Sequence, residues 1–195
     1  MAAVITLMFL MLLIAVAVAG YGLILYNGLV QVKHAVDQAY ANIDVLLKQR
    51  HDELPKLVET CRQYMQFERG TLEKVMEARA AASSARERGD VKGVGAAEGM
   101  MRAGLGTLLA TAEAYPELKS NQSIQAVLGR VTGLENAISD RREFYNEAVN
   151  RNNVRIEEFP DVVVARLLNF GPRDLLEFSE DEKKDVDVKA LFSST

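Results

Sequence analysis

The chain has 195 residues and a net charge of -4, which fits one water-soluble domain in addition to its apolar N-terminal stretch. It contains no basic block and no basic stripe interleaved with aromatic side chains, so the sequence gives no support for a nucleic-acid partner. The single cysteine, Cys61, excludes an internal disulfide and leaves the redox compartment open.

The N-terminal stretch carries no Asp, Glu, Lys or Arg before Lys33, and it is almost wholly apolar between Ala3 and Tyr26. A helix needs about 20 apolar residues to cross the hydrocarbon core of a bilayer. We therefore predict a single transmembrane anchor over residues 1–26, in contact with lipid through residues 3–26.

A cleaved signal peptide is the alternative, because Ala17-Val18-Ala19 resembles a signal-peptidase site. However, no Lys or Arg precedes the apolar run, and the run continues past Ala19 to Tyr26. Both features favour a retained anchor.

Apolar residues recur at spacings of three and four after the anchor, which predicts a first amphipathic helix up to about Arg50. Asp52 is a good N-cap residue, and Pro55 is best tolerated in the first turn of a helix. We therefore expect a kink or tight turn near residues 50–53, followed by a second helix over about 54–82. Its apolar side chains should be buried: Leu54, Leu57, Val58 and Cys61.

Two further helices are expected over about 96–115 and 122–159, each ended by a proline, Pro116 and Pro160. A short apolar piece follows over 162–170. No alternation typical of strands rises above noise. We predict an all-α protein, with the transmembrane helix followed by an elongated antiparallel four-helix bundle over residues 27–170. Residues 171–195 form an acidic tail, expected to be mostly extended or disordered.

Catalytic and metal-binding motifs are missing from the sequence. The two histidines, His34 and His51, lie outside any Glu-x-x-His pattern, and no phosphate-binding or nucleophile motif occurs. Cys61 lies on an apolar stripe, which favours a buried structural thiol. The glycines over 99–106 favour close helix packing over phosphate binding. We predict no catalytic site, no metal and no cofactor.

Charged residues are dense around the expected turn, and they are the first candidate for a partner-binding surface: Asp44, Lys48, Arg50, Asp52 and Glu59. Pairing between residues four apart and capping of the second helix would also explain them.

Three polar residues occupy seam positions of the last long helix, Arg141, Asn152 and Arg155. They are either solvated, with the arginine stems along the core edge, or they form a polar cleft or self-association surface.

The chain resembles the LemA family of bacterial membrane proteins over nearly its whole length. Its most specific match, residues 43–60 (IDVLLKQRHDELPKLVET), is similar to the family's I-D-V-x-L-K-R-R-x-D-L-I-P-N-L-V-E-T. Further matches lie at residues 26–30, 77–81, 112–119 and 136–160. Departures are Tyr40 for the usual Trp, Gln49 for a basic residue and Lys56 for Asn. The resemblance implies a membrane-anchored helical bundle without established enzymatic activity, from a family with one branch in magnetosome membranes and others encoded near membrane metalloproteases.

Two functions follow from these observations. The first is a non-enzymatic scaffold or adaptor, which binds an unidentified membrane or envelope protein or forms a homo-oligomer. The second is an enzyme or ligand sensor with a bundle cleft that uses Asp44, Asp52 and Glu59 as acid–base carboxylates.

Basic residues occur only after the anchor, with Lys33 first and Lys48 and Arg50 further on. The positive-inside rule then predicts an external N-terminus and a cytoplasmic bundle, held in the bacterial inner membrane.

Overall fold

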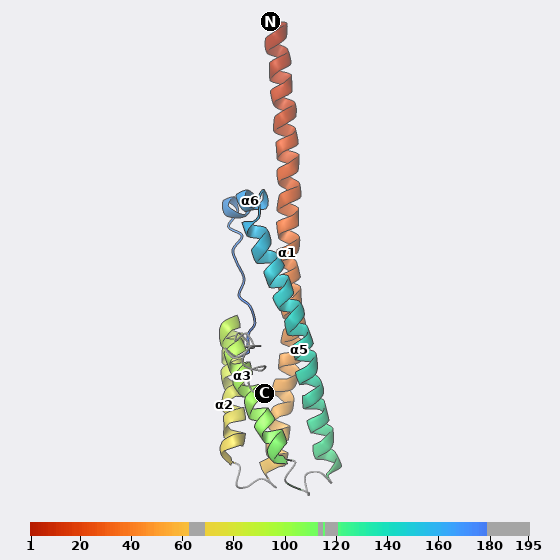
Figure 1. Cartoon of the computed structure of the whole chain (residues 1–195), viewed down its shortest axis with the longest axis vertical. Helices are drawn as coiled ribbons and strands as arrows, with labels where there is room; N and C mark the ends of the chain where they lie inside the picture. Colours follow the sequence, from red (N-terminus) through yellow and green to blue (C-terminus); the bar gives the residue numbers. More distant parts are fainter. Residues whose placement is uncertain (63–68, 113–114, 116–120, 179–195) are drawn as a thin grey trace, which may run out of the picture. The chain divides into compact units, whose positions relative to one another are not determined.

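The computed structural model describes residues 1–62, 69–112, 115 and 121–178. These residues form helices and contain no strand, which confirms the all-α prediction (Figure 1). The helices are α1 (Ala2–Arg62), α2 (Arg69–Glu87), α3 (Val91–Ala112), α5 (Gln122–Glu157) and α6 (Asp161–Leu167). The chain divides into two compact units: unit 1 comprises Met1–Asn42 and Glu143–Arg173, and unit 2 comprises Ile43–Arg142 and the chain from Asp174 onward.

Of the kink or tight turn predicted at residues 50–53, the tight turn is absent, and the prediction that Asp52 caps a new helix is wrong. Helix α1 continues through Pro55 to Arg62. Proline has no N–H, so it leaves the carbonyl four residues earlier without its helical donor. That carbonyl belongs to His51, and the Nε–H of Arg79 on α2 donates to it at 2.9 Å. A tertiary hydrogen bond therefore replaces the missing helical one.

Unit 2 is an antiparallel bundle of the α1 segment from Ile43, α2, α3 and the first part of α5, whose directions alternate (Figure 1). Its core contains the side chains predicted for the second helix, which confirms that prediction. The buried members from α1 are Leu54, Leu57, Val58 and Cys61. Their spacing matches one uninterrupted helical face, which fits the continuation of α1 through Pro55.

The loop between α2 and α3 is shorter than the sequence suggested. Gly89 adopts a left-handed conformation with φ of 66° and ends α2. The Asp90 carboxylate then accepts a hydrogen bond from the Gly93 N–H at 2.9 Å, as an N-cap does. Helix α3 consequently begins at Val91, before the predicted residue 96.

The described part of the predicted tail, residues 171–178, contains no helix or strand, and its residues 174–178 belong to unit 2, where they pass α3. Leu176 and Phe178 are buried. A Cβ atom at Gly95 or Gly99 would collide with the carbonyl oxygen of Glu177 or Phe178, respectively. The close packing expected at Gly99 therefore serves this extended segment of the chain. Residues 179–195 lie outside the described residues.

Unit 1 contains the apolar part of α1. Over the described residues, α1 is the one helix long and apolar enough to cross a membrane, with a mean hydropathy of 2.9 in a window of which none is buried. Beyond this stretch, Leu29 packs with Ile156 of α5 and Ala165 of α6. The rings of Tyr26 and Phe170 meet edge-on at 6.1 Å between centroids.

Candidate functional site

A buried ion cluster lies in the interior of unit 2. The guanidinium of Arg50 on α1 pairs with the carboxylates of Glu98 on α3 and Glu135 on α5. Arg50 is 1% exposed and Glu98 2%, whereas Glu135 keeps some access to solvent. These three residues, the Arg50 cluster, connect three helices of the bundle through charge.

The pKa of Arg50 is lowered, with desolvation as the largest cause. Burial lowers the pKa of Arg50 by desolvation, the ion pair and hydrogen bond with Glu135 oppose this shift, and Arg102 adds to it. The guanidinium stays charged, because arginine is not deprotonated in proteins. Removing one member of such a cluster leaves an uncompensated buried charge, which costs about 3–5 kcal/mol. Arg50 therefore links α1 to α3 and to α5 through ion pairs of its buried guanidinium.

Three further ion pairs of unit 2 involve carboxylates of α1. The Nε–H of Arg86 on α2 donates to the Asp44 carboxylate at 2.7 Å. Glu53 lies 3.0 Å from the Lys56 Nζ and 3.7 Å from a guanidinium nitrogen of Arg130 on α5. The Arg86–Asp44 pair links α2 to α1 and the Arg130–Glu53 pair links α5 to α1, whereas the Lys56–Glu53 pair lies within α1.

The sequence-predicted site residues do not form one surface. On α1, Lys48, Asp52 and Glu59 are exposed, whereas Asp44 is bound to Arg86 and Arg50 is buried. The placement of Arg50 on a partner-binding surface is therefore wrong, because its side chain fills an interior position between carboxylates.

The remaining three candidates, all on α5, are divided between the units. Arg141 is exposed in unit 2. In unit 1, Asn152 is buried, which corrects its placement on a binding surface. Arg155 donates from Nε to Asp161 at 3.1 Å, and its guanidinium lies so close to Gly28 of α1 that a Cβ there would collide with it. Arg155 thus joins α5, α6 and α1.

The carboxylates proposed for acid–base chemistry are too far apart to act together. Asp44, Asp52 and Glu59 lie on one straight helix, so successive members are about 12 Å and about 10 Å apart along its axis at 1.5 Å per residue. Asp52 and Glu59 are exposed. This geometry does not provide the burial that separates the pKa values of a catalytic pair.

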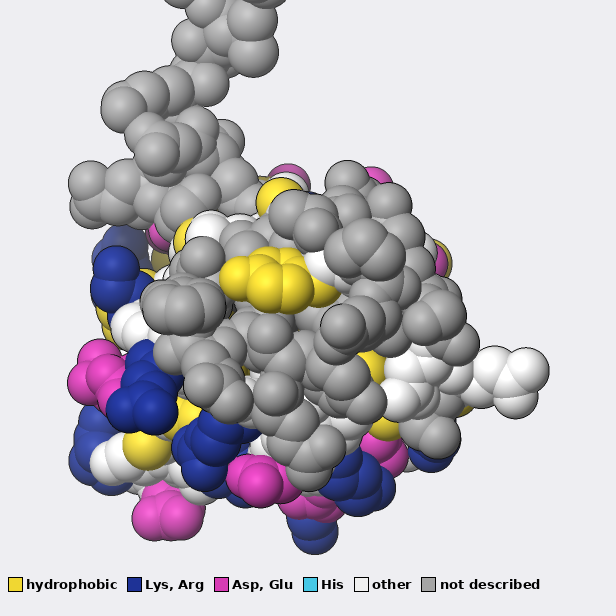
Figure 2. Space-filling model, turned by 90° about the horizontal axis from the view of Figure 1, so that it is seen from below, with side chains coloured by type: hydrophobic (Ala, Val, Ile, Leu, Met, Phe, Trp, Pro, Cys, Tyr) yellow, Lys and Arg dark blue, Asp and Glu magenta, His cyan; other side chains and the backbone are white. Residues whose placement is uncertain are grey.

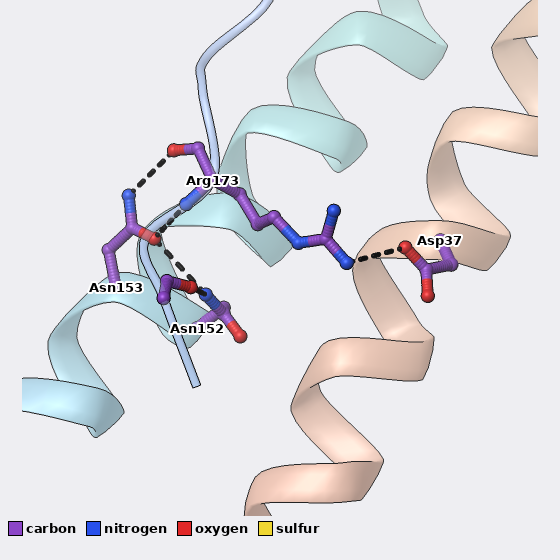
Figure 3. Close-up of polar contacts among 5 residues, drawn as sticks. Asp37, Asn152, Asn153 and Arg173 are labelled. Carbon is purple, nitrogen blue, oxygen red and sulfur yellow. Dashed lines mark hydrogen bonds and ion pairs between the residues drawn. The ribbon is translucent and has the colours of Figure 1, made fainter. Parts of the chain in front are cut away.

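A polar junction in unit 1 was not found from the sequence (Figure 3). The Asn153 side chain accepts a hydrogen bond from the Arg173 N–H at 2.8 Å and donates one to the Arg173 carbonyl at 2.9 Å. Asn152 donates to the Asn153 side-chain oxygen at 3.1 Å. The Arg173 guanidinium then reaches Asp37 of α1 at 3.1 Å. The two adjacent asparagines on α5 are visible in the sequence as a polar pair. The sequence does not indicate that the chain after α6 passes beside them and that Arg173 is their partner.

A cavity of about 560 Å³ lies beside this junction. Its lining includes the cations of Lys33 and Arg173, the amide of Asn152 and the rings of Tyr26 and Phe170. Among the described residues, no group of three or more His, Cys, Asp or Glu side chains is placed to hold a metal ion.

The fold and these sites define an all-helical, membrane-associated protein whose interior charges connect helices. The model of the LemA family matches residues 39–190, and the chain belongs to that family. A search of curated proteins found no match to the chain.

Proposed function

We propose that this protein is a single-pass, membrane-anchored helical-bundle adaptor, which has no catalytic activity and acts through protein–protein contacts at the membrane. The observation that carries the proposal is the course of α1. One unbroken helix contains both the exposed apolar stretch near the N-terminus and buried core residues of unit 2, such as Leu54 and Leu57. The same helix, α1, therefore supplies both the proposed membrane span and one helix of the bundle.

The use of charge in unit 2 supports binding rather than catalysis. The buried charges of the Arg50 cluster are paired with one another, and Asp44 is paired with Arg86. Basic and acidic side chains are interspersed among the described residues on the face in Figure 2. Mixed charge of this kind suits a polar, reversible protein contact.

The partner surface is assigned to three exposed residues of α1, Lys48, Asp52 and Glu59, which we call the α1 stripe. Their spacings of four and seven place them on one face of the helix. The partner is a membrane or envelope protein with charges complementary to the stripe. The positive-inside rule favours a cytoplasmic bundle in the bacterial inner membrane.

Photo-crosslinking in native membranes tests the proposal. A photoreactive residue is placed at each stripe position of the full-length chain, and at the exposed α5 positions Thr132 and Asn136 as matched controls. We expect one discrete adduct from the stripe and none from the controls. An adduct of twice the chain mass would identify a homo-oligomer. Equal labelling at all positions, or no adduct from the stripe, would contradict the proposal.

Orientation is tested separately by a reporter fused after Thr195 that is active only after export. We expect low activity in intact cells. High activity would place the bundle on the outer side and assign the adaptor to the cell envelope.

A further inference from the structure

An exposed apolar face lies on the short helix α6 of unit 1. Phe159 is 85% exposed and Leu167 75%, and Val163 and Leu168 are exposed as well. Val163 and Leu167 are four residues apart within α6, which places them on one side of the helix. Phe159 lies in the turn just before α6, and Leu168 follows directly after it. These four residues are the α6 face. In a water-soluble protein, a cluster of large apolar side chains of this kind marks an interaction surface.

The other side of α6 is fixed to the rest of unit 1. Ala165 packs against Leu29 of α1. The Asp161 carboxylate accepts the hydrogen bond from Arg155 of α5, and it is nearly buried there. The exposed apolar residues thus lie on the side of α6 that faces away from its contacts with α1 and α5.

The position of α6 along α1 identifies what covers this face. Within unit 1, α6 lies beside α1 and past the end of α5 (Figure 1). Phe170 meets Tyr26, the last residue of the apolar run, and Ala165 meets Leu29. Leu29 is about 4.5 Å past Tyr26 along the helix axis. If the hydrocarbon core ends near Tyr26, the contact with Leu29 places α6 in the layer of headgroups beside it. Interfacial helices bury their apolar side about 5–10 Å into the boundary between headgroups and acyl chains, so the exposed side chains of α6 are within reach of that boundary.

We propose that the α6 face is a second membrane contact, in which Phe159, Val163, Leu167 and Leu168 enter the interfacial layer of the bilayer beside the span. The inference rests on the proposed passage of α1 through the membrane. Nearby charges have both signs, with Arg166 on α6 and Glu157 and Glu158 just before it, all exposed. Apolar insertion rather than attraction to anionic lipid therefore carries the contact, and a zwitterionic bilayer is sufficient.

The absence of tryptophan from the chain permits a direct test. Single-tryptophan variants of the full-length protein, Leu167→Trp and Phe159→Trp, are reconstituted into phosphatidylcholine vesicles without bromine or with lipids brominated both near the headgroup end and near the methyl end of the acyl chains. Bromine quenches only tryptophans that contact the lipid. Leu13→Trp in the apolar run is the positive control, and Val45→Trp on an exposed part of α1 in unit 2 is the negative control.

We expect Leu167→Trp and Phe159→Trp to be quenched by the brominated lipid and to emit at shorter wavelength than Val45→Trp, which should not be quenched. If Leu13→Trp is quenched and both α6 variants are not, the span is correct and the inference is overturned. A blue-shifted but unquenched α6 tryptophan would also overturn it, because a second copy or another protein would then cover the face. An unquenched Leu13→Trp would instead refute the proposed anchor, and with it the inference.

Discussion

Replacement of Arg50 by methionine tests how the helices of unit 2 are held together. The variant keeps much of the side-chain volume but leaves the Glu98 carboxylate, 2% exposed, without its cation. Loss of one partner from a buried ion pair costs about 3–5 kcal/mol. At about 2–4 °C per kcal/mol for a chain of this size, the melting temperature should fall by about 10 °C.

The assay is thermal unfolding of the full-length protein in detergent micelles, monitored by far-UV circular dichroism. Lys48→Met is the matched control, because it removes an exposed positive charge from the same helix, and its effect should be small. Combining Arg50→Met with Glu98→Leu should recover part of the lost stability, because the second change removes the uncompensated charge. If Arg50→Met melted at the wild-type temperature, the structural role of the cluster would be refuted.

Two further predictions concern the region around Pro55. Arg79→Ala should destabilise the protein by about 1–3 kcal/mol, because it leaves the His51 carbonyl without a donor. In a Pro55→Ala background, where a backbone N–H can reach that carbonyl, Arg79→Ala should cost clearly less stability. Equal costs in the two backgrounds, measured by chemical denaturation as a double-mutant cycle, would contradict a replacement of the helical hydrogen bond by Arg79. Desolvation and the positive charge of Arg79 lower the pKa of His51 below its ordinary value. As the pH falls, His51 is therefore protonated in the unfolded state before it is protonated in the folded state. The free energy of unfolding should consequently decrease as the pH drops below about 6.5. His51→Gln should reduce this loss of stability between pH 7.5 and 5. If the melting temperature of the variant depended on pH as that of the wild type does, His51 would not be the group responsible.

Helical periodicity was sufficient to predict the fold class and the core of unit 2, because apolar stripes such as Leu54, Leu57 and Cys61 reflect local geometry. The continuation of α1 was not predictable in the same way. Pro55 is locally a helix-breaking signal, and the compensating donor, Arg79, lies on another helix. Local propensity was overridden by a tertiary contact.

The burial of Arg50 and Glu98 has a signal in the sequence. Arg50 lies three residues after Leu47 and four before Leu54, which is the spacing of the buried stripe. Glu98 likewise lies between Val94 and Met101 on the apolar side of α3. Charges at such positions indicate a paired interior site. Which charges meet depends on how the helices pack, and a single sequence does not contain that information.

The packing of residues 174–178 could not be predicted from composition. The acidic character of the tail favoured an extended or disordered chain. Three apolar residues of the segment, Leu175, Leu176 and Phe178, pointed to burial, and two of them, Leu176 and Phe178, are buried. The backbone of Glu177 and Phe178 lies beside Gly95 and Gly99, and this packing requires two glycines from a distant helix.

Charge reversal on the α1 stripe tests the central claim, partner binding through α1, most directly. The photoreactive residue is kept at Asp52 in the full-length chain, and Lys48→Glu and Glu59→Lys are introduced together, which leaves the net charge unchanged. The yield of the partner adduct in native membranes is compared with that of the unreversed chain, and circular dichroism confirms the fold of both. We predict that the adduct is lost when the charges are exchanged. Retention of the adduct at the original yield would contradict recognition of a partner through this stripe.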